Sequence, residues 1–317
     1  MKKFVKILVI LGLVLCLCGG IVTAAGYIGG GFRELSGKDS PYVITAVPSS
    51  QGQENPTTAV SSSQGMENLT FSPDDIDRLE FRLNSENIAF RPSDDGQIHI
   101  RYIKRDDVTY TAYQEQSAAS DGLGTLVFTR KDTSTGTQLF HFGVEFDDDT
   151  ADVQVALPKG LSVDVLTASG DMEFSGVTVA ALSVSTVSGD VDLTKVQTDD
   201  LTVGTTSGDV DLEHTTVSGE TNLETTSGEL DLEDCTLNGP LSVSSVSGDL
   251  EGQAMISGNV TIDTTSGDVE LELSGSPAHS AGDISTTSGE MNLQGLQAQA
   301  DYVVNASTVS GDVTIRH

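Results

Sequence analysis

The sequence lacks tryptophan altogether, and aromatic residues make up only 5% of its 317 residues. Basic residues are also scarce, because 16 Lys and Arg stand against 47 Asp and Glu, for a formal net charge of −31. Proteins that bind DNA or RNA place Lys and Arg against phosphate, so this balance excludes nucleic acid as a partner. It also disfavours adsorption to anionic lipid and favours partners that are basic, neutral or bridged by cations.

Cysteine is rare as well, with three in the chain. Cys16 and Cys18 fall in an apolar N-terminal stretch, so only Cys235 remains in the rest of the sequence. A single cysteine forms no internal disulfide, and the fold must therefore be held by its core. We expect Cys235 to be a small buried apolar residue rather than a reactive thiol.

The sequence also lacks the patterns that carry catalysis. It has no HExxH, no phosphate loop and no evident nucleophile–base pair. Enzymes that cleave acidic polysaccharides commonly need Arg or Lys near paired acids. Residues 161–317 contain only Lys195 and Arg316 as bases, and only Phe174 and Tyr302 as aromatics that could stack on a sugar. We therefore predict a protein that is not an enzyme and needs no cofactor.

What the sequence does contain is a phrase, Ser-Gly-Asp or Ser-Gly-Glu, that occurs eight times in the C-terminal half. Successive glycines are 19, 19, 20, 20, 19, 22 and 22 residues apart. A period near 20 residues is typical of stacked repeat architectures. The repeat glycines are Gly170, Gly189, Gly208, Gly228, Gly248, Gly267, Gly289 and Gly311.

Apolar residues alternate on both sides of each glycine. Around Gly208 they are Leu201 and Val203 before it, and Val210 and Leu212 after it. This period of two predicts a strand on each side of a tight turn, in which glycine permits an unusual backbone conformation. The unit is too small to bury its own apolar face, so we predict an all-β protein, a parallel β-solenoid with about 20 residues per coil and about 4.8 Å between coils.

The alternative is an antiparallel meander in which each strand–turn–strand unit is a hairpin. A hydroxyl residue three positions before every repeat glycine favours the solenoid, because a solenoid stacks like residues on like. This column is Thr167, Thr186, Thr205, Thr225, Ser245, Thr264, Thr286 and Thr308.

The N-terminal segment, residues 1–32, begins with three lysines and continues without charge from residue 7 to residue 32. The 22 residues from 7 to 28 are long enough to cross a bilayer as a helix, with the N-terminus in the cytoplasm. A secreted protein, cleaved near Ala24 or Ala25, is the alternative. A lipoprotein is disfavoured, because Cys16 and Cys18 follow leucines where a small residue is usual.

Three further segments follow the predicted anchor. Residues 33–70 are rich in Ser, Gln and Pro and predict a flexible linker. Residues 71–160 carry candidate strands without the period, and we interpret them as irregular N-terminal β coils and a cap. A separate small β domain is the alternative. Residues 161–317 form the predicted solenoid, and its final strand, at 313–315, has no cap after it. An open edge of this kind predicts end-on self-association or an end-on partner.

One column of acids follows the repeat glycines directly. Stacked carboxylates about 5 Å apart repel one another, and bound calcium would relieve the repulsion. The simpler interpretation, which we favour, is that each acid accepts backbone N–H bonds in its own turn. The column is Asp171, Asp190, Asp209, Glu229, Asp249, Asp268, Glu290 and Asp312.

With phrases such as "VQVALPKGLSVDVLTASGDMEF" and "LTVGTTSGDVDL", residues 71–317 resemble a bacterial family labelled "putative adhesin". The resemblance implies a β-solenoid on or near the cell envelope, and it brings no catalytic residues. It suggests a surface scaffold or adhesin-like module whose partner is an envelope polymer or protein. The alternative is an envelope-stress sensor or regulator that acts through a membrane partner.

Overall fold

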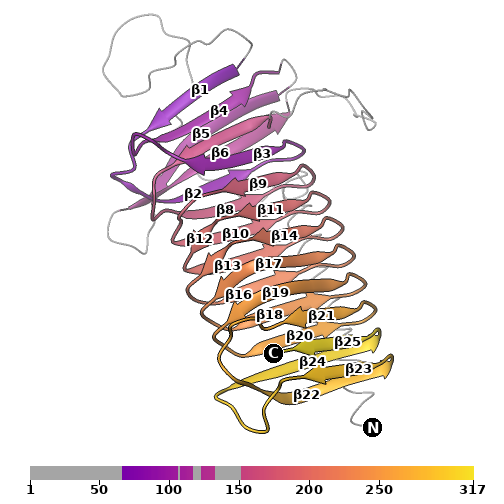
Figure 1. Cartoon of the computed structure of the whole chain (residues 1–317). Coiled ribbons are helices and arrows are strands. Elements are labelled where there is room, and N and C mark those ends of the chain that lie inside the picture. The colour runs from indigo at the N-terminus through magenta and orange to yellow at the C-terminus, as the bar shows by residue number, and fades with distance from the viewer. Residues whose placement is uncertain (1–65, 106–107, 117–122, 133–150) are drawn as a thin grey trace, which may run out of the picture.

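The computed structural model describes residues 66–105, 108–116, 123–132 and 151–317 as two sheets wound into one elongated stack (Figure 1). All regular elements in these ranges are strands, as predicted. The proposed membrane segment at 1–32 lies outside the described residues, and so does the predicted linker up to residue 65. Within the described ranges, no helix is long and apolar enough to cross a membrane.

Each repeat contributes one strand before its Ser-Gly-acid turn and one after it. The strands before the turn belong to an 11-stranded sheet, here sheet B, and those after it to a 14-stranded sheet, here sheet A. In sheet B they are β8 (Ser162–Leu166), β10 (Ala181–Ser185), β13 (Asp200–Gly204), β16 (Thr221–Glu224), β18 (Leu241–Ser245) and β20 (Val260–Thr264). In sheet A they are β9 (Met172–Ser175), β11 (Val191–Thr194), β14 (Val210–Glu213), β17 (Leu230–Leu237), β19 (Leu250–Ile256) and β21 (Val269–Glu272). Short strands β12 (Gln197–Thr198) and β15 (Thr216–Val217) lie at the second turn.

The coils stack in parallel and in register. Val191 of β11 lies opposite Met172 of β9 on one side and Val210 of β14 on the other. Leu193 follows the same rule two residues later, and both side chains are buried. This pairing excludes the hairpin meander, because equivalent residues of successive repeats are direct neighbours.

At the N-terminal end, the order of coils in space differs from their order in the chain. β2 (Ile76–Arg82) and β3 (Ile88–Pro92) stack on β8 and β9, whereas β6 (Gly124–Asp132) and β7 (Val153–Leu157) stack outside them. Three antiparallel strands cover the outermost coil: β4 (Ile98–Ile103), β1 (Met66–Phe71) and β5 (Val108–Gln116). β1 therefore begins inside the segment predicted to be linker.

The C-terminal end is permuted too. The last repeat, β24 (Tyr302–Ser310) and β25 (Val313–Arg316), is inserted between the β20–β21 coil and the coil made by β22 (His279–Ser288) and β23 (Met291–Gln294). The prediction that strand 313–315 ends the rod is wrong. The two final repeats are 22 residues long instead of 19 or 20, and this extra chain allows the crossing.

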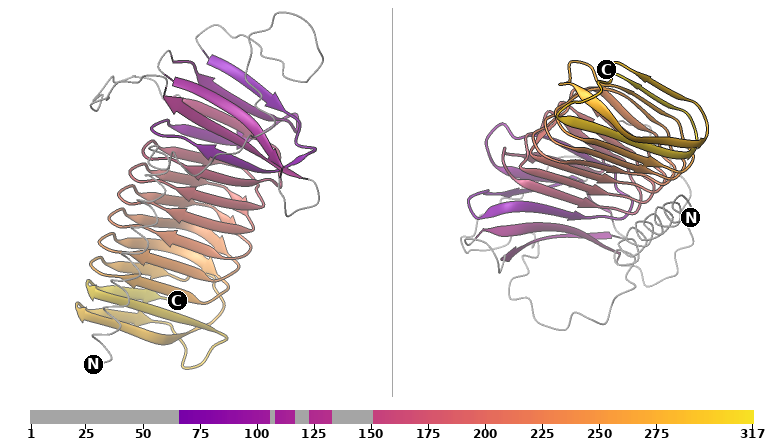
Figure 2. Two further views of the ribbon diagram at one scale, coloured as in Figure 1. Left: turned by 180° about the vertical axis from the view of Figure 1, so that it is seen from behind. Right: turned by 90° about the horizontal axis from the view of Figure 1, so that it is seen from below.

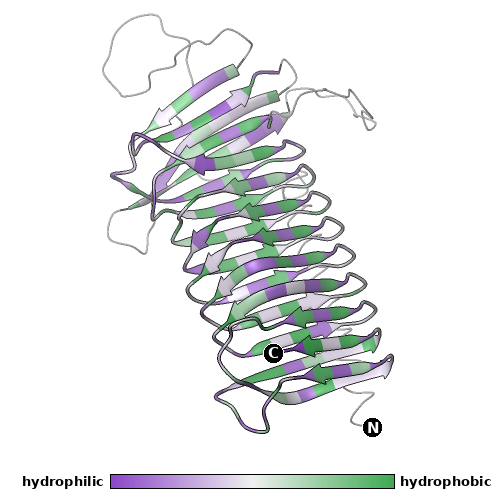
Figure 3. Ribbon diagram, viewed as in Figure 1, coloured by the Kyte–Doolittle hydropathy of each residue, from purple (hydrophilic) through white to green (hydrophobic). Residues whose placement is uncertain are grey.

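The interior is mainly apolar along the whole rod, and apolar residues alternate with polar ones along each strand (Figure 3). Near the N-terminal end it is aromatic: Phe90 stacks on Phe174 with centroids 4.3 Å apart, and Phe81 meets Phe90 edge-on at 5.2 Å. From β11 onward the buried column is aliphatic. Larger rings therefore fill the irregular coils, and uniform Val and Leu residues fill the regular ones.

The repeat glycines are required mainly because the backbones of stacked turns approach closely. A Cβ on Gly208 would overlap the carbonyl oxygen of Gly189, and one on Gly228 would overlap that of Gly208. Among the eight repeat glycines, only Gly170 and Gly311 have a positive φ, at 120° and 156°. The sequence suggested that glycine is needed for an unusual backbone conformation, and this explanation is wrong for most of the repeat glycines.

Candidate functional site: the acidic face of sheet A

The predicted acid column lies at the turns, and its carboxylates bind the next coil. The backbone N–H of Asp209 donates to Asp190 Oδ1 at 2.9 Å, and that of Glu229 donates to Asp209 Oδ1 at 2.8 Å. We expected each acid to bond within its own turn, and this is wrong, because the acceptor serves the following coil. Further bonds of this kind link Asp171 to Asp190, Asp249 to Asp268, Asp268 to Asp312 and Asp312 to Glu290.

In the column of hydroxyl residues three positions before the repeat glycines, three members accept an N–H of their own turns, whereas Thr186, Thr264 and Thr308 have no hydrogen-bond partner for Oγ1 among the described residues. Thr205 Oγ1 accepts the N–H of Gly208 at 3.0 Å, and Thr225 Oγ1 accepts that of Gly228 at 2.9 Å. Ser245 makes the same bond with Gly248. These buried hydroxyls therefore close their own turns, and they leave the acids free to connect neighbouring coils.

A second line of acids, which the sequence interpretation missed, runs along the outer surface of sheet A. These residues lie three positions after the repeat glycines and alternate with the buried apolar positions. Parallel pairing places each of them directly opposite the next. We call this line the acid ladder: Glu173, Asp192, Asp211, Asp231, Glu251 and Glu270.

Arginines close both ends of the acid ladder. Arg91, on β3, lies 2.7 Å from Glu173, and Arg316, on β25, forms an ion pair with Glu270. Both arginines lie in coils adjacent to the ladder. The four acids between them face other acids in register, an arrangement that destabilises a sheet.

Two of the central acids, Asp192 and Asp211, have raised pKa values. Partial burial, followed by the charge of Asp211, raises the pKa of Asp192 to about 6. Partial burial and the charge of Asp231 raise the pKa of Asp211 as well. Asp192 and Asp211 therefore hold protons more tightly than isolated carboxylates do, because partial burial and the charge of an ionised neighbour both disfavour their ionisation.

The turn column and the acid ladder do not converge into a metal site. In the ranges that the structure describes, no group of three or more His, Cys, Asp or Glu residues is arranged to hold a metal ion. The turn carboxylates already accept backbone N–H bonds. Calcium binding by this column stays a prediction.

The outer surface of sheet B carries few charges. The residues in register there are mostly serine, threonine and asparagine, and the acids Asp164, Glu224 and Asp263 are not opposite one another. Asp164 does face an acid, Glu80 of β2, but each of these two carboxylates forms an ion pair with an arginine. This line of neutral polar residues is Ser183, Thr202, Asn222, Ser242, Thr261 and Asn305.

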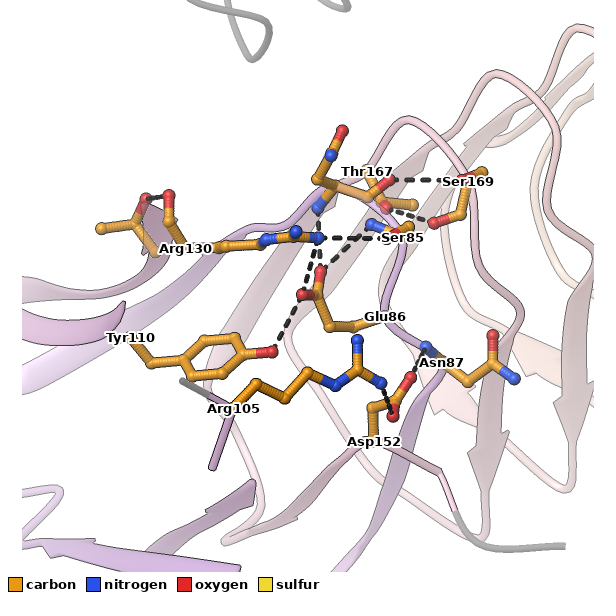
Figure 4. Close-up of polar contacts among 11 residues, drawn as sticks. Ser85, Glu86, Asn87, Arg105, Tyr110, Arg130, Asp152, Thr167 and Ser169 are labelled. Carbon is orange, nitrogen blue, oxygen red and sulfur yellow. Dashed lines mark hydrogen bonds and ion pairs between the residues drawn. The ribbon is translucent and has the colours of Figure 1, made fainter. Parts of the chain in front are cut away.

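One buried carboxylate stands apart from both surfaces. Glu86 is fully buried where the first coil has no Ser-Gly-acid phrase, and it occupies the place that glycine takes in the repeats (Figure 4). Its Oε1 accepts a bond from Tyr110 at 2.9 Å and lies 3.0 Å from Arg130, while its Oε2 accepts the N–H groups of Asn84 and Ser85. Tyr110 and Arg130 lie on the outer strands β5 and β6, whereas Asn84 and Ser85 belong to the same turn as Glu86, so Glu86 connects the N-terminal cap to the first coil.

Cys235 is 2% exposed, and burial raises the pKa of its thiol to about 11. Its prediction as a buried apolar residue is confirmed. It aligns with Ala254 rather than with Met255, because the register shifts at this corner.

Two of the histidines lie in different surroundings. His214 is exposed at a corner, whereas buried His279 bonds to the carbonyl oxygens of Pro277 and Gly258.

Two solved structures resemble the chain at low identity. The first, of a "putative adhesin" from Bacteroides fragilis, is 15% identical with a TM-score of 0.45, and the match covers 80% of this chain and 97% of that one. The second, of a "putative cell adhesion protein" from Clostridium sporogenes, is 12% identical with a TM-score of 0.31, covering 79% and 98%. No curated protein matches the chain.

The family comparison covers nearly all of the described fold. The model of the Toastrack DUF4097 family matches residues 76–316, from the first strand of the innermost N-terminal coil to the last strand of the C-terminal repeat. By this match over most of its length, the chain belongs to the Toastrack DUF4097 family.

Proposed function

We propose that this protein is a non-enzymatic interaction module of the bacterial cell envelope. It presents the acidic face of sheet A, as a scaffold or adhesin-like surface, to a basic envelope polymer or protein. The single observation that carries the proposal is the acid ladder. Six acids in register weaken the sheet that holds them, and a surface that served only solubility would gain from interspersed charges.

The shape and charge of the acidic face suit a partner that is long and basic. Stacking in register repeats the acids at the spacing of sheet strands, about 4.8 Å. A linear array of like charges focuses its field on an extended counter-charge and attracts it over distances of about a Debye length, 8 Å at physiological salt. An extended basic segment would meet several carboxylates at once.

The test is sedimentation of the full chain with envelopes of the producing organism. A variant with Asp192→Asn, Asp211→Asn, Asp231→Asn and Glu251→Gln removes the four central charges of the acid ladder. The matched control removes four exposed acids elsewhere: Asp74→Asn, Asp94→Asn, Asp199→Asn and Asp301→Asn. We expect saturable binding by the wild type and the control, weakened by salt, and loss of binding by the ladder variant.

Equal loss of envelope binding in both variants would mean that the acidic face contributes only through the net charge of the protein. If no variant and no wild-type protein sediments with envelopes, the scaffold proposal fails. The remaining candidate is then the regulator that acts through a membrane partner. A deletion strain with normal attachment and altered stress induction would support that role.

We also propose that residues 1–32 anchor the chain in the cell membrane, with the described fold outside. The support is the uncharged stretch from 7 to 32 after three lysines. Protease added to intact protoplasts should degrade the fold and leave a membrane-bound N-terminal fragment. Release of the full fold into the medium would instead indicate cleavage near Ala24 or Ala25.

A further inference from the structure

The two ends of the rod are built differently. At the N-terminal end, antiparallel strands β1, β4 and β5 cover the outermost coil (Figure 2). At the other end, β22 and β23 are the last strands of their sheets, and no described strand pairs beyond them. β1 and β5 are likewise the last strands of their sheets at the N-terminal end, but the apolar side chains of Leu69, Tyr102 and Tyr110 are buried there, so the core is closed at that end. We call the end formed by β22 and β23 the open end.

Apolar side chains emerge at the open end. Met291 and Leu293 of β23 are 52% and 38% exposed, whereas Val313 and Ile315, in register with them on β25, are fully buried. Both are inward-facing positions of the coil, so the core of the solenoid reaches solvent here.

The backbone at this edge is also open. The N–H of Val313 donates to the carbonyl oxygen of Glu290 at 2.9 Å, and the same bond recurs in the preceding coils. The equivalent N–H of Met291 points beyond the last strand of sheet A, where none of the described residues forms a further strand. A row of free donors and acceptors is a template for another strand.

The charge pattern changes at the same place. Asn292 lies at the position of the acid ladder, in register with Thr314, and Gln294 follows it. At the outward positions of β23, two copies brought together at this edge would meet with neutral amides, and one turn acid, Glu290, lies beside the strand in each copy. Contact between any two central coils would bring acids together at the outward positions as well. Amide side chains at such a junction also bond to one another.

We infer that the open edge pairs with the same edge of a second copy of this chain. Because the core is buried at the N-terminal end and exposed only at the β22–β23 end of the described fold, two exposed cores meet only in a closed, two-fold contact between two such ends, and not in head-to-tail stacking. A two-fold axis normal to the sheets pairs β23 antiparallel with the β23 of the other copy and joins the two cores. The register of β22 is irregular around Gly282 and Asp283, so the contact uses residues 284–288 and β23.

The position of the open edge relative to the membrane determines which copies the contact joins, and this step rests on the membrane anchor proposed above. The chain enters the described fold at β1, at the end opposite to β23 (Figure 1). In a chain anchored through residues 1–32, the open edge is the outer tip. The pair would then join copies that are anchored at separate places.

The test is sedimentation equilibrium of the full chain in mild detergent. One variant, Met291→Lys with Leu293→Lys, places charges in the shared core. A second, Asn292→Asp with Gln294→Glu, restores the acidic pattern on outward side chains and does not disturb the core. The matched control is Asn222→Asp, on the outer surface of sheet B. Circular dichroism and thermal melting check that all three fold.

We expect a dimer for the wild type and the control, and a dissociation constant raised at least about tenfold in both edge variants, equivalent to about 1.4 kcal/mol. A wild type that stays monomeric up to its solubility limit would overturn the inference, and so would a dimer that survives both edge variants. If the wild type dimerises only after removal of residues 1–65, the chain's own N-terminal segment covers the edge, and the inference also fails. If the wild type forms the dimer but does not sediment with envelopes, the result counts against the proposed function and leaves this inference standing.

Discussion

The outer surfaces of sheets A and B belong to the same coils, yet different kinds of residue stack in register on them. Their inner surfaces are alike: Leu182 and Val184 of β10 are buried as fully as Val191 and Leu193 of β11. Outside, sheet B places serine, threonine and asparagine in register, whereas sheet A places acids in register. Since the repeats of sheet B stack without a continuous line of acids, the fold does not need one, and the acid ladder is a property of the surface rather than of the architecture.

The largest expected effect tests the turns that hold the two surfaces in register. Gly208→Ala places a Cβ against the carbonyl oxygen of Gly189, and the backbone cannot retreat without breaking the stack. We expect a loss of about 3 kcal/mol in the free energy of unfolding, measured by urea titration. Gly204→Ala, four residues earlier on sheet B, is the control, because nothing lies within 4 Å of its added Cβ. Its effect should be within about 0.5 kcal/mol, and equal losses would disprove the close-approach explanation.

The next effect concerns pH. The folded state raises the pKa of Asp192 from 3.8 to about 6, and the pKa values of Asp211 and Glu229 also rise. Between pH 3.8 and about 6, Asp192 holds a proton in the folded protein that it releases in the unfolded chain. The stability that these groups contribute is therefore greatest at low pH and falls as pH rises through about 6. After allowance for screening, we expect a melting temperature about 3 °C higher at pH 5 than at pH 7. Asp95, whose pKa is lowered to about 2, titrates below this window.

Asp192→Asn should narrow that difference between the two pH values, because it removes the most strongly shifted carboxylate. A melting temperature that falls from pH 7 to pH 5 would contradict the assignment of acid–acid repulsion to sheet A.

A smaller effect comes from exchanging the character of the two surfaces. Asp211→Asn removes a charge that faces Asp192 and Asp231, and it should stabilise the protein at pH 7 by about 0.5 kcal/mol. Thr202→Asp adds an acid between neutral Ser183 and Asn222, and it should change stability by less than about 0.5 kcal/mol. Thermal melting of both variants measures the contrast. Strong destabilisation by Thr202→Asp would mean that sheet B tolerates acids no better than sheet A.

The smallest expected effect is that of calcium. Asp190 and Asp209 already accept backbone N–H bonds from the next coil, so we expect equal melting temperatures in calcium and in chelator. A rise in calcium that Asp209→Asn abolishes would establish the turn column as a cation site.

The sequence predicted the repeated part of the fold closely. A fixed offset between glycine and the flanking apolar residues predicted both strands, their turn and their parallel stacking, because one pattern repeated in phase has one simple packing. The acid ladder was available at the same offset as these strands, as the outward residues between the apolar ones. It was missed because only the acids at the turn were followed.

The ends of the rod were not predictable in the same way. Nothing in residues 76–92 repeats the Ser-Gly-acid phrase, yet they form the coil on which β8 and β9 stack, with buried Glu86 in the place of glycine. Nor does the order of the last two repeats follow from their residues, since both carry the same phrase. Their exchange depends on which coil best covers β20 and β21.

By itself, the sequence determined the period, the faces of each strand, the acidity and the requirement for glycine at the turn, because these are local properties of residues at fixed spacing. Only the tertiary structure decided which coil lies beside which, why the glycines are needed, and which edge stays open. Those outcomes depend on contacts between residues from 19 to 84 positions apart. Each acid is an ordinary surface residue in the chain, and it becomes part of a charged line only when the coils place it against its neighbours.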